Sequence, residues 1–253
     1  MIDFEARGRV ALITITRPEA RNAVNGAVAA GLEDAVKRLE GDPDLWVGII
    51  AGAGPAFCAG ADLKEVAAGR AATLATDRGG FAGITRLERS KPLIAAVDGP
   101  ALAGGCEIVL TCDLVVASTA ASFGIPEVKR SLIAGAGGLF RLARALPRNV
   151  AMELAITGDP ISAERAYALG LVNELCDPGG AVEAALALAE RVCVNAPVAV
   201  QLSRELVLAE DVAGDEEAWR LTDAATATVM QTQDFAEGPR AFIEKREPVW
   251  SGR

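Results

Sequence analysis

The segment PLIAAVDGPALAGGCEIVLTCDLVVAS, from Pro92 to Ser118, decides the fold class of this chain of 253 residues. Valine, leucine and isoleucine dominate Pro92–Gly99 and Asp113–Ser118, which is typical of buried strands. Between them, Gly104–Cys112 reads as a helix that begins at two glycines. Strand, helix and strand in this order predict an α/β architecture with buried strands.

The same alternation extends on both sides of this segment. Val10–Pro18 reads as the first strand, and Leu45–Gly54 as a buried strand that opens into a glycine loop. Between them, a helix is expected from Asn25 to the break at Gly41–Pro43. Its apolar stripe is Val28, Leu32, Val36 and Leu39. A further helix is expected in Ala134–Leu146, and Ser162–Leu175 reads as a helix, a turn at Gly170 and a short strand. After about Asp177 no strand signal remains, and long helices are expected in Ala181–Val192 and Val198–Met230.

Composition excludes several classes of protein. A net charge of −9 argues against sequence-independent binding to nucleic acid or to an anionic membrane surface. No apolar run reaches the roughly 18 residues that cross a bilayer, and MIDFEARG lacks the apolar core of a signal peptide. Five cysteines without a CxxC pair argue against a disulfide framework and a Cys-ligated zinc site. We therefore expect a cytoplasmic protein with reduced thiols.

The chain contains no histidine. Ser-His-Asp and Cys-His hydrolases, HExxH metalloproteases and His-ligated metal sites are thereby excluded. A general base must be a carboxylate, a lysine, a thiol or the single tyrosine, Tyr167.

Three glycine-containing loops carry the candidate chemistry. In Gly52–Glu65 the dinucleotide pattern GxGxxG fails because Phe57 stands at the third glycine position. What remains is a turn at Ala59–Ala61 that enters a helix, whose free backbone N–H groups are able to face an anion. The alternative is a structural turn in which Asp62 caps the helix.

The other two loops each hold one acid. Glu107 stands in the first turn of the helix after Gly104, among apolar neighbours that favour a partly buried carboxylate with a perturbed pKa. The alternative is an acid that merely complements the helix dipole. Glu127 follows Pro126, and its alternative is a solvated turn acid. Two acids and two sets of backbone amides suit proton transfer beside a developing oxyanion.

Several motifs in this order resemble those of the crotonase, or enoyl-CoA hydratase, superfamily. They are FCAGADLKE (57–65), GPALAGGCEIVLTCD (99–113), FGIPEVKRSLIAGAGG (123–138) and AITGDPISAERAYALGLVNEL (155–175). The resemblance runs from TRPEARNAV (16–24) to EKREPVW (244–250). It implies a spiral of ββα units over residues 1–195 and a helical oligomerisation region over residues 196–253. It also implies a homotrimer or a dimer of trimers.

The resemblance assigns roles to single residues. It places the oxyanion hole at the backbone N–H groups of Ala61 and Gly104, Glu107 as the base toward water, and Glu127 as the acid toward Cα. The residues that it implies for contact with CoA are Arg17, Arg21, Ala61, Asp62, Leu63, Lys64 and, from a neighbouring subunit, Lys245. It implies no metal and no cofactor beyond the CoA of the substrate.

The expected activity is reversible addition of water to a trans-2-enoyl-CoA, as in fatty acid metabolism. The alternatives are double-bond isomerisation or another reaction through a CoA enolate, and an acyl-CoA-binding protein with little turnover. One departure bears on the substrate: Leu139 and Phe140 stand where typical hydratases carry Thr-Gln. The acyl chain length and the pathway are left open.

Overall fold

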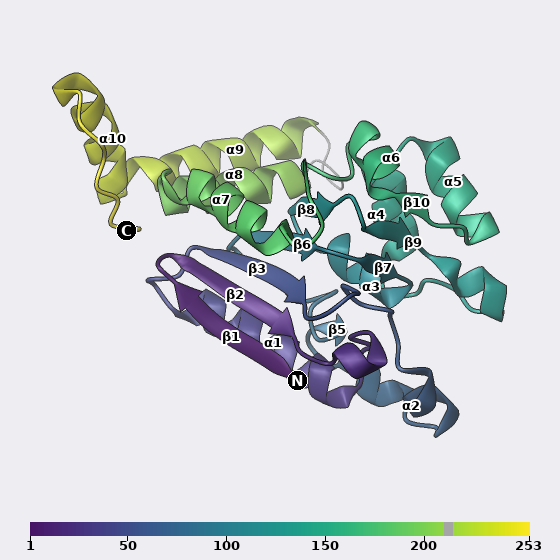
Figure 1. Cartoon of the computed structure of the whole chain (residues 1–253). Coiled ribbons are helices and arrows are strands. Elements are labelled where there is room, and N and C mark those ends of the chain that lie inside the picture. The colour runs from purple at the N-terminus through teal and green to yellow at the C-terminus, as the bar shows by residue number, and fades with distance from the viewer. Residues whose placement is uncertain (210–214) are drawn as a thin grey trace.

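A six-stranded sheet forms the centre of the molecule in the computed structural model, which describes residues 1–209 and 215–253 (Figure 1). Its strand order is β1 (Ile2–Arg7), β2 (Val10–Ile15), β3 (Val47–Gly52), β6 (Leu93–Val97), β8 (Leu114–Ser118) and β11 (Glu174–Cys176). Only β1 and β2 pair antiparallel; the other neighbours are parallel. The predicted α/β class with buried strands is confirmed.

The sequence prediction missed β1 and wrongly made Val10–Pro18 the first strand. Strand β1 lies at the edge of the sheet, and Ile2 and Phe4 are its two half-buried side chains. Four of its six residues are exposed, so its apolar signal is too weak to identify a strand by composition.

Helices cover both faces of this sheet. On one face α1 (Gly26–Gly41) buries the predicted stripe from Val28 to Leu39 against Ile13 and Ile15. On the other face α7 (Ala181–Cys193) packs on Val10 and Leu12. Successive side chains of a strand point to opposite faces, which is why neighbouring residues of β2 enter different cores.

A second, three-stranded sheet brings the candidate loops together. It consists of β10 (Ile161–Ser162), β9 (Ser122–Gly124) and β7 (Pro100–Leu102). The chain passes from β6 through β7 into α3 (Gly104–Val109), and from β8 through β9 into the 3-10 helix η3 (Pro126–Arg130). Each of these two ββ-helix units therefore contributes its first strand to the six-stranded sheet and its second strand to the three-stranded sheet. Because β7 pairs with β9, α3 and η3 begin side by side.

Shorter elements complete this part of the chain. They are η1 (Pro18–Ala20), α2 (Leu63–Ala67), η2 (Ala71–Leu74), β4 (Ala75–Thr76), β5 (Gly80–Phe81), α4 (Gly138–Ala145), α5 (Arg148–Thr157) and α6 (Ala163–Ala168).

The C-terminal part is helical, as predicted. It contains α8 (Pro197–Ala209), α9 (Asp215–Met230) and α10 (Gln233–Glu244). The part of the predicted run Val198–Met230 that spans residues 210–214 lies outside the described residues. The predicted boundary at residues 195 and 196 falls between α7 and α8, and a division into two units there stays a prediction. Figure 1 shows α10 projecting from the end of the molecule opposite α2.

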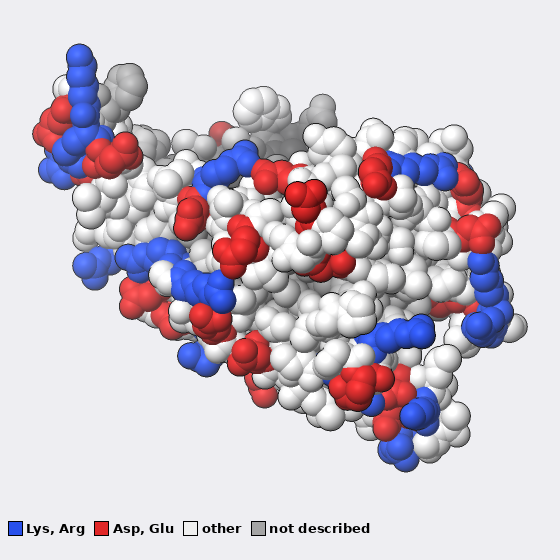
Figure 2. Space-filling view, in the orientation of Figure 1, with Lys and Arg blue, Asp and Glu red and all other residues white. Residues whose placement is uncertain are grey.

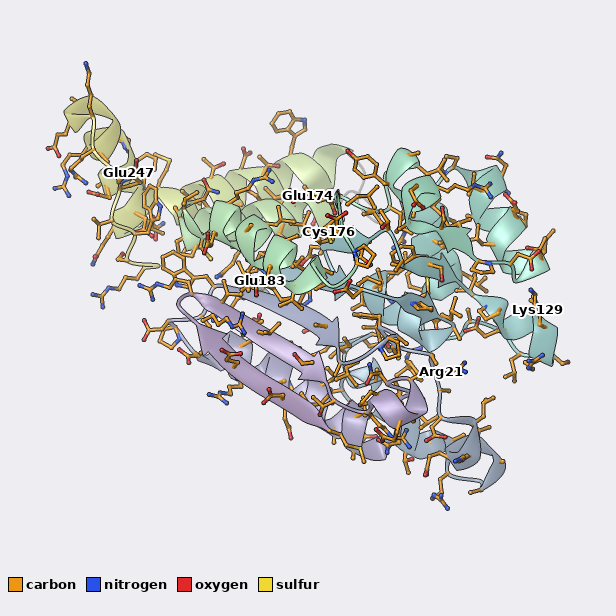
Figure 3. The ribbon with its side chains drawn as sticks, viewed as in Figure 1. Arg21, Lys129, Glu174, Cys176, Glu183 and Glu247 are labelled. Carbon is orange, nitrogen blue, oxygen red and sulfur yellow. The ribbon has the colours of Figure 1, made fainter. Side chains whose placement is uncertain are left out.

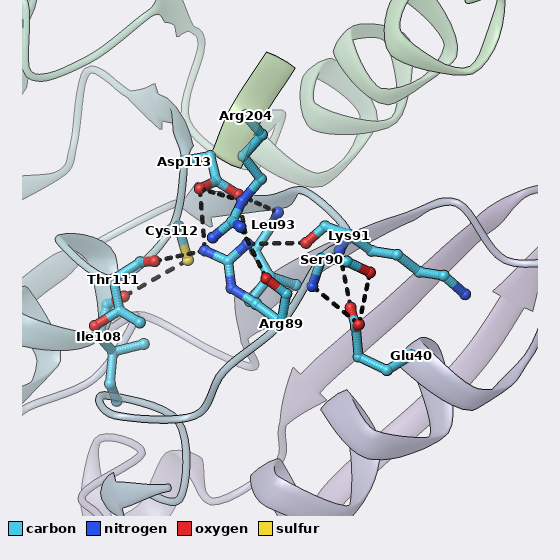
Figure 4. A network of polar contacts seen from close by, with 10 residues as sticks. All are labelled: Glu40, Arg89, Ser90, Lys91, Leu93, Ile108, Thr111, Cys112, Asp113 and Arg204. Atoms are coloured by element: carbon cyan, nitrogen blue, oxygen red, sulfur yellow. Dashed lines mark hydrogen bonds and ion pairs between the residues drawn. The ribbon is translucent and has the colours of Figure 1, made fainter. Parts of the chain in front are cut away.

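A buried ionic network joins α8 to the core (Figure 4). Asp113 accepts hydrogen bonds from Arg89 at 2.6 Å and from Arg204 of α8 at 2.9 Å. The Asp113 oxygen that accepts the 2.6 Å hydrogen bond from Arg89, Oδ2, also accepts the N–H of Leu93 at 2.8 Å. Helix α8 is therefore anchored to the sheet of its own chain by a charged contact.

The visible surface has no block of one charge. Figure 2 shows Lys and Arg mixed with Asp and Glu at both ends of this face, around α10 and around α2. In the described ranges, no single helix is long and apolar enough to span a membrane.

Candidate active site

Two of the predicted loops run against each other at the beginning of α3. A parallel bridge joins Cys58 to Ala101, and Gly60 takes a φ of +90°. A Cβ atom at Gly60 would lie 2.8 Å from the backbone N of Gly104. Glycine is therefore required at this crossing, both for the positive φ and for the close approach. The crossing sets Ala61 beside Gly104.

The N–H groups of Ala61 and Gly104 are available to a ligand. Ala61 pairs with Val24, but that bridge uses the carbonyl of Gly60 and the N–H of Asp62, so the N–H of Ala61 points away from it. Gly104 is the first residue of α3, where the helix supplies no acceptor for its N–H. Within residues 1–209 and 215–253, neither amide donates a hydrogen bond. The predicted oxyanion donors thus lie together and unpaired.

Glu107 lies in the first turn of α3 and is 3% exposed. Its Oε1 accepts the N–H groups of Ala136 at 2.8 Å and Gly138 at 2.9 Å. A Cβ atom at Gly138 would lie 2.9 Å from this oxygen, so a larger residue there would displace the carboxylate. Burial raises the pKa of Glu107, while the two N–H groups and the charge of Arg141 oppose the rise. The predicted partly buried carboxylate is what the structure shows.

Glu127, on η3, is a half-buried carboxylate. Its Oε2 is buried and has no hydrogen-bond partner among the described residues. Burial, with a contribution from the charge of Glu107, raises the pKa of Glu127 to about 7. The two carboxylates are therefore close enough to influence each other. The alternative of a solvated turn acid is wrong, because η3 turns this side chain inward.

An apolar cavity of about 400 Å³ adjoins Glu127. Its lining consists of Ile125, Glu127, Val128, Ile133, Ala134, Leu139, Ala143, Arg148, Ala151, Met152, Ala155 and Ile156. Apart from Glu127 and Arg148 the lining side chains are apolar, so the cavity suits a hydrocarbon chain.

Asp62 and Arg17 fix the turn that carries Ala61. Asp62 caps α2 by accepting the N–H of Lys64 at 2.9 Å, which confirms the alternative reading of this acid as a helix cap. A guanidinium nitrogen of Arg17 lies 2.7 Å from the Asp62 carboxylate and 2.9 Å from the carbonyl of Ala23. The Arg17 hydrogen bond lowers the pKa of Asp62. Arg17 thus holds the turn, and its contact with a phosphate stays a prediction.

The other predicted CoA contacts lie on the surface. Leu63 and Lys64 are exposed on α2, and Arg21 lies on the exposed turn after η1 (Figure 3). Lys245 follows α10, at the end of the molecule opposite α2 (Figure 1), so it does not join the site of its own chain. The prediction assigned Lys245 to a neighbouring subunit, and that assignment stays a prediction.

Sequence reasoning missed two residues that pack against the loops of the site, Phe81 and Arg141. The ring of Phe81 packs on Gly104, since a Cβ atom at Gly104 would lie 2.4 Å from this ring. Arg141 donates hydrogen bonds to the carbonyls of Ala136 at 3.1 Å and Thr85 at 2.7 Å. No local pattern marks these residues, because Phe81 contacts Gly104 and Arg141 contacts Thr85 only after segments distant in the sequence have packed together.

Two neighbouring carboxylates, one buried and one half-buried, beside two unpaired amides are suited to proton transfer next to a developing oxyanion, the chemistry of a thioester enolate. Comparison with known proteins agrees with this class of site. Residues 5–253 match the family model described as enoyl-CoA hydratase/isomerase. The chain is 41% identical over 245 residues to a mevalonyl-coenzyme A hydratase of Aspergillus fumigatus, covering 95% of this chain and 91% of that protein.

A carnitinyl-CoA dehydratase of Salmonella typhimurium is 38% identical over 252 residues, covering 97% of this chain and 96% of that protein. The crystal structure of an enoyl-CoA hydratase from Mycobacterium tuberculosis superposes with a TM-score of 0.96 at 46% identity, covering 100% of this chain and 99% of that one. The chain therefore belongs to the enoyl-CoA hydratase/isomerase family and has the crotonase fold. It is an enzyme of this superfamily, and its relatives support a hydratase-type reaction.

Proposed function

We propose that the enzyme adds water reversibly across the trans-2 double bond of an enoyl-CoA thioester. The observation that carries this proposal is the pair of neighbouring carboxylates on separate elements, the buried Glu107 and the half-buried Glu127. Isomerisation moves one proton between two carbons and needs a single acid-base group. Hydration needs one group for water and another for Cα. Two such carboxylates therefore favour hydration over isomerisation.

The amides of Ala61 and Gly104 stabilise the developing charge. As water adds at Cβ, negative charge accumulates on the thioester oxygen, which accepts these two N–H groups. One oxyanion donor is typically worth about 3 to 4 kcal/mol in the transition state. Both N–H groups are fixed by the loop crossing, so their orientation costs nothing at the moment of reaction.

The two carboxylates divide the protons. Glu107 is held through Oε1, so its Oε2 takes a proton from water while the water oxygen bonds to Cβ. Glu127, with a pKa raised to about 7, keeps a substantial protonated fraction at neutral pH, and this form gives its proton to Cα. In the reverse direction each group runs the opposite step. Because the two groups interact, their titrations belong to the pair.

The cavity next to Glu127 receives the acyl chain. Its volume of about 400 Å³ and its apolar lining support a hydrocarbon tail. The related mevalonyl-coenzyme A hydratase and carnitinyl-CoA dehydratase carry different acyl groups in their names, so membership of the family does not choose the substrate. We propose CoA as the carrier of the acyl group and no further cofactor. A cytoplasmic location stays a prediction.

Large apolar side chains on the C-terminal helices support a homotrimer or a dimer of trimers. Val207, Trp219 and Ile243 are 73%, 68% and 77% exposed. Burying such side chains between subunits is favourable by roughly 2 kcal/mol each. The same assembly would bring Lys245 toward a neighbouring site.

The test is the loss of enone absorbance on trans-2-enoyl-CoAs of increasing chain length, with the wild type and Glu107→Gln compared. Proton transfer of this kind is worth about 10²–10⁴ in rate, so Glu107→Gln is expected to lower kcat at least ~10²-fold. The affinity for CoA is expected to stay nearly unchanged. Glu183→Gln, which changes an exposed glutamate, is the matched control.

Two outcomes contradict the proposal. A fully active Glu107→Gln variant removes Glu107 from the mechanism. Binding of the whole panel without hydration, tested together with conversion of 3-enoyl-CoAs, points to an isomerase or to an acyl-CoA-binding protein.

A further inference from the structure

Arg141 is half-buried on α4 and reaches two loops that both support the site. Its guanidinium donates to the carbonyl of Ala136 at 3.1 Å and to the carbonyl of Thr85 at 2.7 Å. These carbonyls belong to segments about 50 residues apart. The planar, forked guanidinium is suited to hold two acceptors in fixed directions.

The first segment holds Glu107. Ala136 accepts a hydrogen bond from Arg141 through its carbonyl and donates one to Glu107 Oε1 through its N–H at 2.8 Å. Between Ala136 and Gly138, Gly137 takes a φ of +100°, and a Cβ atom there would lie 2.4 Å from an Arg141 nitrogen. The loop is thus enclosed between Arg141 on one side and the Glu107 carboxylate on the other.

The second segment supports the oxyanion hole. Thr85 donates to the carbonyl of Phe81 through its N–H at 3.3 Å and through its hydroxyl at 3.1 Å. The Phe81 ring packs on Gly104, whose N–H is one of the two oxyanion donors. Arg141 therefore links the loop that holds Glu107 to the segment whose Phe81 ring packs on Gly104.

We propose that Arg141 is a positioning residue that fixes Glu107 relative to the amide of Gly104. Its guanidinium donates to the backbone carbonyls of Ala136 and Thr85 and acts on Glu107 through them. This inference rests on the proposed function, in which both groups act in the same step. A displacement of about 1 Å between such groups costs on the order of 10²-fold in rate.

Charge adds an observable consequence. The charged and titratable groups that face Glu107 are Arg141 from α4, Glu127 from η3 and Cys106 on its own helix. Burial raises the pKa of Glu107, and Arg141 is the positive group whose charge opposes that rise. Without it, Glu107 binds its proton at a higher pH, so the acid limb of the pH profile is expected to move upward.

The test compares Arg141→Gln and Arg141→Lys with Arg144→Gln. The control removes one positive charge from the next turn of α4, where Arg144 stacks on the same Phe140 ring as Arg141. Arg141→Gln is expected to lower kcat by about 10- to 100-fold with a smaller change in KM and to raise the acid limb. Arg141→Lys keeps the charge but not the fork, so kcat is expected to stay low. If Arg141→Gln does not fold, Arg141→Lys alone tests the inference.

Full activity and an unchanged pH profile in Arg141→Gln would overturn the inference. Full rescue by lysine would also overturn it, because charge alone would then suffice. An inactive wild type would instead refute the proposed function. In that case the Glu107 carboxyl, followed by NMR with ¹³C-labelled glutamate, decides: a pKa that changes in Arg141→Lys as well as in Arg141→Gln, but not in Arg144→Gln, supports the inference, and a wild-type pKa in Arg141→Lys refutes it.

Discussion

Ionised Glu127 is expected to lower the free energy of unfolding. Its Oε2 is buried without a hydrogen-bond partner among the described residues, and burial beside Glu107 raises its pKa from 4.5 to about 7. One pKa unit corresponds to about 1.4 kcal/mol between the two protonation states. Ionised Glu127 therefore costs the folded state about 3 kcal/mol relative to the unfolded chain.

The sign follows from proton binding. Between pH 4.5 and about 7 the folded protein keeps the Glu127 proton that the unfolded chain has lost, so the free energy of unfolding falls as pH rises through this window. Below pH 4.5 both states are protonated and no penalty exists. Above about pH 7 the penalty is complete. Glu127→Gln is neutral at every pH, so its free energy of unfolding does not carry this penalty.

Urea unfolding at pH 4 and pH 8 measures this effect. Glu127→Gln is expected to match the wild type at pH 4 and to exceed it by about 2 to 3 kcal/mol at pH 8, while losing hydration activity. The exposed Glu183→Gln variant is expected to show no such pH-dependent gain. Equal stability of Glu127→Gln and wild type at pH 8 would refute the argument from burial.

Two further predictions concern the C-terminal helices. Asp113→Asn leaves the buried Arg89 guanidinium without a counter-charge and is expected to lower the free energy of unfolding by about 3 kcal/mol in urea titrations. The control Asp44→Asn breaks an exposed ion pair and is expected to change the free energy of unfolding by less than about 1 kcal/mol. Deletion of the residues after Thr232, which removes α10, is expected to give monomers or insoluble protein; intact trimers in light scattering would contradict a role of α10 in assembly.

The sequence located most regular elements of the core. The strand at Pro92–Gly99 appears as β6, and the helix stripe from Val28 to Leu39 is fully buried in α1. These elements are predictable because burial on a sheet or helix face imposes a local apolar pattern. Strand β1 and the two-residue strand β10 were not predicted, because a short strand or an edge strand buries few apolar side chains and so shows little apolar pattern in the sequence.

For the site, the sequence supplied the chemical groups, and only the tertiary structure decided their state. The absence of histidine and the acids in two glycine loops pointed to Glu107 and Glu127 as proton carriers. The apolar neighbours of Glu107 predicted its burial, but the buried, unpaired Oε2 of Glu127 and the hydrogen bond from Arg141 to Ala136 could not be predicted from the sequence. A pKa depends on solvent exclusion and neighbouring charge, and here those come from segments brought together by the pairing of β7 with β9. The local pattern determines which residues are present, while packing determines which of them can move a proton.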